Sequence, residues 1–100
     1  MSAKDFATEY ETVAASQTDQ VLGATGATGD LLETLIITVA TAATGTVSIK
    51  DGAGSAIPIT VANTPIGVYT VQVGARSSAG AWKVTTGAGA TVVAVGRFKP

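Results

Sequence analysis

The stretch "GTVSIKDGAGSAIPITV", from Gly45 to Val61, decides the fold class of this chain. Two runs in which apolar and polar residues alternate flank the dipeptide Asp51-Gly52. Strict alternation predicts half-buried β-strands, and Asp-Gly is a preferred turn of two-stranded hairpins. Because proline cannot donate a ladder hydrogen bond, Pro58 places the second strand at a sheet edge. The stretch therefore predicts an antiparallel hairpin.

The same pattern of short apolar runs separated by turn residues continues to the end of the chain. It predicts an all-β fold, either an antiparallel sandwich or a barrel. Of the two we expect a single antiparallel β-sandwich of jelly-roll-like form. A second hairpin is expected in "AWKVTTGAGATVVAVGRF", with its turn at Gly87–Gly89. The predicted strands are residues 20–22, 31–42, 45–50, 56–61, 68–73, 81–86 and 90–98.

The run 31–42 differs from the others because both of its alternating sets are apolar. One set holds Leu35, Ile37 and Val39, and the other holds Leu32, Ile36 and Ala40. A strand of this kind needs cover on both faces. We expect the second face to contact the N-terminal segment or a neighbouring subunit.

Composition limits the chemistry available to the chain. Its 100 residues make one domain, of which 46% are hydrophobic and 13% charged, with neither cysteine nor histidine. This composition removes thiolate nucleophiles, the usual zinc sites and the side chain best suited to proton transfer near neutral pH. We expect no enzyme activity, no metal and no cofactor. A weakly polar, charge-poor surface favours burial against partners, as in a homo-oligomer or a subunit of an assembly.

Charge is unevenly distributed along the chain. Residues 1–50 carry six acids and two bases, and residues 51–100 carry one acid and four bases, so the halves have net charges of −4 and +3. No cluster of Lys and Arg is dense enough to predict nucleic-acid binding. No signal-peptide pattern and no apolar run of membrane-spanning length is present, so we expect a soluble, non-secreted chain without membrane association.

The glycine-rich stretch "VLGATGATGD", residues 21–30, raises the possibility of a phosphate-binding loop. Its glycine spacing fits neither common phosphate-loop motif, no helical pattern follows, and Asp30 adds negative charge. We interpret the stretch as a turn in which glycine supplies left-handed backbone conformations.

Two aromatic residues admit two interpretations. Trp82 and Tyr69 could form a platform that stacks sugar rings, as in a carbohydrate-binding module. A single tryptophan in a core with few large side chains is more simply a packing anchor, and we favour that interpretation.

The acids and arginines suggest weaker candidates. Asp30 with Glu33, or with Asp19, could offer oxygen ligands to calcium, but they match no loop pattern for that ion. Arg76 and Arg97 are interpreted as loop or edge residues that discourage strand pairing.

Residues 1–19 are predicted to form an N-terminal arm, followed by a sandwich domain of residues 20–100. Within the arm, "ATEYETVAAS" could be a strand or a short helix, and we favour extended structure because Thr and Val flank its second half. The alternative is a terminus that is disordered in the free protein. We expect the arm to dock on a neighbouring subunit, with Phe6 and Tyr10 as anchors and Glu9 and Glu11 meeting basic groups. Glu9 and Glu11 are also explained by a solvated face, without any catalytic role.

Two long segments, "LGATGATGDLLETLIITVATAATGTVSIKDGAGSAI" and "RSSAGAWKVTTGAGATVVAVGRF", carry a family resemblance. Over residues 20–98 the chain resembles small virion-associated β-sandwich proteins of tailed bacteriophages. The resemblance implies a structural protein of the virion, with no catalytic or cofactor residues. The expected function is a capsid decoration or cement protein that binds and stabilises the shell of major capsid protein. The alternatives are a head fibre, a tail component or a carbohydrate-binding module that captures host glycans.

Overall fold

Alternating apolar and polar residues produce a chain made of β-strands, as the sequence predicts. The structure, a computed structural model, describes residues 9–23 and 26–98, and within them it contains no helix. Eight strands are formed in the described part: β1 (Glu9–Val13), β2 (Gln20–Val21), β3 (Leu31–Val39), β4 (Val47–Asp51), β5 (Ile57–Thr60), β6 (Gly67–Arg76), β7 (Trp82–Thr85) and β8 (Ala90–Arg97).

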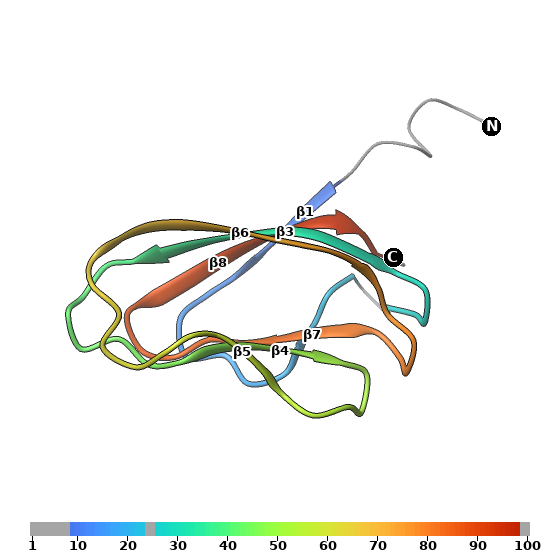
Figure 1. Cartoon of the computed structure of the whole chain (residues 1–100), viewed down its shortest axis with the longest axis horizontal. Coiled ribbons are helices and arrows are strands. Elements are labelled where there is room, and N and C mark those ends of the chain that lie inside the picture. The colour runs from blue at the N-terminus through green and yellow to red at the C-terminus, as the bar shows by residue number, and fades with distance from the viewer. Residues whose placement is uncertain (1–8, 24–25, 99–100) are drawn as a thin grey trace.

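The strands form two antiparallel sheets of four strands that pack face to face (Figure 1). Sheet A has the order β1-β8-β3-β6, and sheet B has the order β2-β7-β4-β5. The first strand pairs with the last, the second with the seventh, the third with the sixth and the fourth with the fifth. This order is that of a long antiparallel ribbon rolled into two sheets, the eight-stranded jelly roll. The predicted fold class is confirmed.

The hairpin predicted around Asp51-Gly52 is confirmed. β4 and β5 pair antiparallel, with Ile49 opposite Ile57. β5 lies at the edge of sheet B, as Pro58 requires.

The second predicted hairpin is wrong, because β7 and β8 lie in different sheets. The connection at Gly87–Gly89 leads from sheet B to sheet A instead of turning the chain back on itself. Both strands are amphipathic, and their buried residues, such as Val84 and Val92, face the same core from opposite layers. Alternation identifies the apolar face of each strand but does not identify its neighbour.

The two apolar sets of β3 do not lie on opposite faces, as the sequence predicts they would. A β-bulge lies between Leu32 and Thr34, where the register with both neighbouring strands shifts. The bulge turns Leu32 onto the same inner face as Leu35 and Ile37. Of the apolar residues predicted for the second face, Ile36 remains there within the strand, between Thr34 and Thr38. Ala40 is exposed just beyond the end of β3.

The core lies between the two sheets and is made of medium-sized apolar side chains from both layers. Its buried members are Val13, Leu22, Leu32, Leu35, Ile37, Val39, Val47, Ile49, Trp82, Val84, Ala90, Val92, Ala94 and Phe98.

Part of the predicted N-terminal arm belongs to this core. The extended structure favoured for this region is confirmed, since β1 pairs with β8 along its whole length. Val13 is fully buried, and Thr86 accepts a hydrogen bond from the N–H of Gln17 at 3.0 Å. Residues 9–19 are therefore part of the sandwich, which corrects the expected domain boundary at residue 19. Residues 1–8 lie outside the described residues.

Candidate functional site

The outer face of sheet A differs in charge from the rest of the described surface. Because side chains alternate along a strand, the residues between the buried ones point away from the core. Within the described chain, the central part of this face carries no charged side chain. We call it the threonine–valine face, and its residues are Tyr10, Thr12, Thr34, Ile36, Thr38, Val68, Thr70, Gln72, Thr91, Val93 and Val95.

Strand pairing brings these residues together from distant parts of the sequence. Thr12 lies opposite Val93, Val93 lies opposite Ile36, and Ile36 lies opposite Thr70. This row crosses all four strands of sheet A. The apolar residues at its centre are shielded by neighbours on the sheet, whereas Tyr10 and Val68 towards the edges are 72% and 65% exposed.

Charged residues gather at one end of the same face. Arg97 of β8 and Arg76 of β6 both pair with Leu31 of β3, one on each side. Glu33 is exposed at the bulge nearby. An uncharged centre beside a charged margin is the arrangement that protein–protein interfaces favour.

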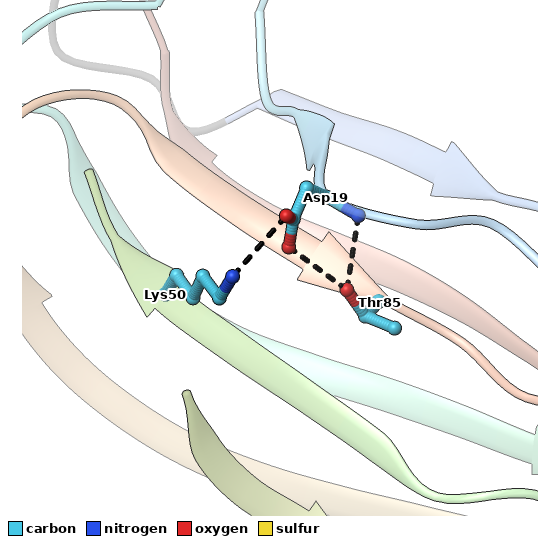
Figure 2. A network of polar contacts seen from close by, with 3 residues as sticks. All are labelled: Asp19, Lys50 and Thr85. Carbon is cyan, nitrogen blue, oxygen red and sulfur yellow. Dashed lines mark hydrogen bonds and ion pairs between the residues drawn. The ribbon is translucent and has the colours of Figure 1, made fainter. Parts of the chain in front are cut away.

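The outer face of sheet B differs because it carries charges near its centre. Lys50 of β4 and Lys83 of β7 lie directly opposite one another, an arrangement that destabilises a sheet unless the charges are compensated. Asp19 supplies compensation, and Lys50 Nζ donates to its Oδ2 at 3.2 Å (Figure 2).

Thr85 completes this network. Its hydroxyl donates to Asp19 Oδ1 at 3.1 Å and accepts the N–H of Asp19 at 2.9 Å (Figure 2). The hydrogen bonds from Lys50 and Thr85 hold the pKa of the Asp19 carboxyl below its ordinary value of 3.8. Both partners of the ion pair are about one-third exposed, so this network orders the segment before β2 and adds little to stability.

A second carboxylate, Asp51, fixes the end of β4 to the connection between β6 and β7. It accepts the N–H of Ala79 at 2.9 Å, and it accepts both the N–H and the hydroxyl of Ser78. These hydrogen bonds, that from Ala79 first, lower the pKa of the Asp51 carboxyl. The sequence assigned Asp51 to a turn and gave no indication of this contact, because its partners lie 27 and 28 residues away.

The described part of the glycine-rich stretch, residues 21–23 and 26–30, ends in a turn before β3, which confirms that interpretation. Gly23, Gly26 and Gly29 all have positive φ, at 87°, 64° and 93°. Asp30 Oδ2 accepts the N–H of Ala27 at 2.9 Å and so closes the turn on itself.

Trp82 is a packing anchor, as the favoured interpretation requires. It is 4% exposed, and its Nε1–H donates to the backbone oxygen of Asp30 at 3.0 Å. Tyr69 packs against the core, and its hydroxyl donates to the oxygen of Pro65 at 2.7 Å. The two rings therefore do not form an exposed platform for sugars.

The three acids considered for calcium are held in separate places. Asp19 pairs with Lys50, Asp30 closes the glycine-rich turn, and Glu33 is exposed on the bulge of β3. Among residues 9–23 and 26–98, no group of three or more metal-ligating side chains is assembled.

Both predicted partner-binding acids already have partners within the chain. Glu9 Oε1 accepts the N–H of Phe98 at 2.9 Å. Glu11 accepts the N–H of Gly23 at 2.7 Å and the amide of Gln20 at 2.8 Å. Both carboxylates thus join β1 to other parts of the sandwich.

Of the predicted aromatic anchors, Tyr10 lies exposed on the threonine–valine face, and Phe6 is outside the described residues. The face itself was missed in the sequence. The alternation of Thr34, Ile36 and Thr38 was a signal for it, but the unrecognised bulge at Glu33 concealed which residues share a face.

Arg76 ends the edge strand β6, as expected, whereas Arg97 ends β8, which lies inside sheet A. The interpretation of Arg97 as an edge residue is therefore wrong.

Comparisons with protein-family models, with curated proteins and with solved structures found no match to this chain.

Proposed function

We propose that the chain is a structural protein of a bacteriophage virion, a decoration protein that binds the major capsid protein through its threonine–valine face. The observation that carries the proposal is the difference between the two outer faces. Sheet A presents eleven uncharged side chains, and sheet B presents Lys50, Lys83 and Asp19. Interface centres are depleted in charge, so sheet A is the face to bury.

The size of the face suits a protein that acts in many copies. Four strands spaced about 4.8 Å apart, with about six residues each, cover an area on the order of 400 Å². A stable interface between two proteins buries about 800 Å² on each partner, so one such contact is weak. Repetition over a regular shell, or linkage of copies, compensates for a weak single contact.

The fold is compatible with this role. Eight-stranded jelly rolls occur in viral capsid proteins and also in lectins and cupins. The resemblance over residues 20–98 to small phage virion proteins favours the first of these classes. As the alternative within the same structural class, the chain is a head fibre or a tail component of the virion.

The first test of the proposal asks whether purified virions contain the chain. Virions purified from the phage whose genome encodes the chain are analysed by mass spectrometry and electron cryo-microscopy. We expect the chain in many copies, with density on the outer shell. Absence of the chain from purified virions would overturn the proposal, and density confined to the tail would select that alternative.

The role of the face is tested by two matched variants that each add one positive charge. Thr38→Lys places the charge on the threonine–valine face, and Ser48→Lys places it on the outer face of sheet B. Virions stripped of the chain are incubated with each variant and sedimented. We expect Thr38→Lys to bind at least tenfold more weakly than the wild type and Ser48→Lys to bind like it. Equal binding of both variants would show that the shell contacts another surface.

A further inference from the structure

The two sheets have four edge strands within the described residues, and three of them are protected against pairing with another chain. β2 has two residues, β5 has four residues and contains Pro58, and β1 has five residues and contains Glu9 and Glu11. Short strands, proline and charge are the means by which natural sheets prevent association at their edges.

β6 lacks this protection over most of its length. It has ten residues, no proline and no charged residue before Arg76 at its end. From Gly67 to Gln72 it pairs with β3 in unbroken register, and a bulge with Gly74 at φ 61° interrupts the ladder beyond that point. The regular part of β6 therefore offers a row of unpaired backbone groups to an added strand.

Exposed apolar side chains gather on the same side of the sandwich. Five large hydrophobic residues of the described chain are exposed, and four of them belong to β5, to β6 or to the connection between them. Their exposed fractions run from 46% to 68%, and they are Ile57, Val61, Ile66 and Val68.

This side is also large enough for a stable contact. Figure 1 looks down the shortest axis of the chain and shows both sheets edge-on, so the side with β5 and β6 spans the two longer extents, 45 and 27 Å. Its outline, roughly 1,000 Å², sets the upper limit of the area that this side can bury, and that limit lies above the area of about 800 Å² that each partner buries in a stable dimer.

We propose that the occupant of this edge is a second copy of the chain, with the two β6 strands paired antiparallel about a two-fold axis. Directly opposite residues in a ladder must point to the same face of the sheet, so outward residues pair with outward residues. This condition excludes an axis that passes between two residues, and the two residues at the middle of the regular part of β6 are Tyr69 and Thr70.

The side chains favour Thr70. An axis there places Thr70 opposite Thr70 of the second copy, and it places each Tyr69 opposite Val71 of the other copy. Threonine–threonine pairs and pairs of an aromatic with a β-branched residue are both favourable across strands. An axis beside Tyr69 would instead oppose two inward-facing rings, each already held by its hydrogen bond to Pro65.

Repulsion between like charges does not oppose this register. The two Arg76 side chains would be displaced along the ladder by twelve residues, a distance of about 40 Å. The dimer would contain one continuous eight-stranded sheet, with two threonine–valine faces side by side. The inference does not depend on what that face binds.

The register is tested by cysteine cross-linking, because the chain has no cysteine of its own. Opposite residues in an antiparallel pair have Cα atoms about 4.5–5.5 Å apart, within the range of a disulfide. Under mild oxidation, Thr70→Cys should form covalent dimers. Gln72→Cys is the control, because its copies would lie about 13 Å or more apart in the same dimer. Equal cross-linking of the two variants, or of neither, would overturn the proposed register.

Charge substitutions test the interface without any covalent bond. Sedimentation over about a thousandfold range of concentration should show a monomer–dimer equilibrium for the wild type. Thr70→Lys and Thr70→Glu should each raise the dissociation constant at least tenfold, and a mixture of the two should form a heterodimer. Thr12→Lys, on the opposite edge strand of the same sheet, should dimerise like the wild type. A wild-type chain that stays monomeric throughout would overturn the proposal.

Discussion

Replacing Gly52 with alanine and replacing Gly74 with alanine test how closely the end of β4 packs against the rest of the sandwich. The two glycines have almost the same backbone conformation, with φ at 58° and 61°. Their surroundings differ. A Cβ atom on Gly52 would clash with the backbone carbonyl of Ala79 and would lie 2.6 Å from the nitrogen of Gly80. A Cβ atom on Gly74 would meet no atom within 4 Å.

The expected magnitudes follow from these two contributions. Left-handed backbone at a residue with a side chain costs about 1–2 kcal/mol, which applies to both variants. Overpacking adds about 1–3 kcal/mol at Gly52 only. The atoms that would have to move there are backbone atoms, and the hydrogen bonds from Ala79 and Ser78 to Asp51 hold them in place. We expect Gly74→Ala to lose about 1–2 kcal/mol of unfolding free energy and Gly52→Ala to lose about 2–5 kcal/mol.

Urea unfolding followed by circular dichroism measures both losses. The midpoint should fall in each variant while the slope stays constant, so that the change reports stability alone. In a domain of this size each kcal/mol lowers the melting temperature by about 4–8 °C. The reasoning is refuted if the two variants differ by less than about 0.5 kcal/mol, because the close approach to Ala79 would then carry no cost.

Three further predictions concern separate parts of the chain. Because the pKa of Asp51 is lower in the folded chain than its unfolded value of 3.8, its carboxylate stabilises the fold above that pH, and this stability is lost as the pH falls through the folded pKa. The unfolding free energy of the wild type should therefore fall in this acid range, and that of Asp51→Asn should fall less. Tryptophan emission should be blue-shifted and unchanged by added sugars, and a sugar-dependent emission would contradict the buried position of Trp82. Trp82→Phe should lower the unfolding free energy by about 0.5–1.5 kcal/mol through loss of the hydrogen bond to the Asp30 oxygen, which keeps its second bond from the N–H of Ser77. Deleting residues 2–13 removes β1 and should abolish cooperative unfolding. Deleting residues 2–8 is the control, because it leaves every described strand in place. Equal melting curves for the two deletions would show that β1 is dispensable.

The features that could be predicted from the sequence are those that depend on residues close to one another along the chain. Alternation with Asp51-Gly52 between two runs predicted the β4–β5 hairpin, and Pro58 predicted its position at an edge. The burial of Trp82 followed from its size in a core with few large side chains.

Features that depend on distant neighbours were not predictable in the same way. The bulge in β3 changes which residues share a face, and no local residue pattern predicts it. The separation of β7 from β8, and the pairing of β1 with β8, depend on which strand lies beside which in the complete fold. The threonine–valine face combines four strands from both ends of the chain, so it exists only once the jelly roll is assembled.

The pairing of the first strand with the last has a consequence for engineering of the chain. Glu9 at the start of β1 lies opposite Gly96 near the end of β8, and the Glu9 carboxylate accepts the N–H of Phe98. The two ends of the sandwich are therefore close enough for a short linker to close the chain into a ring. The loop of residues 53–56 is exposed throughout, so the ring can be reopened there. Such a circular permutant would carry its new ends on the β4–β5 hairpin, and a fused peptide would then leave the molecule from sheet B.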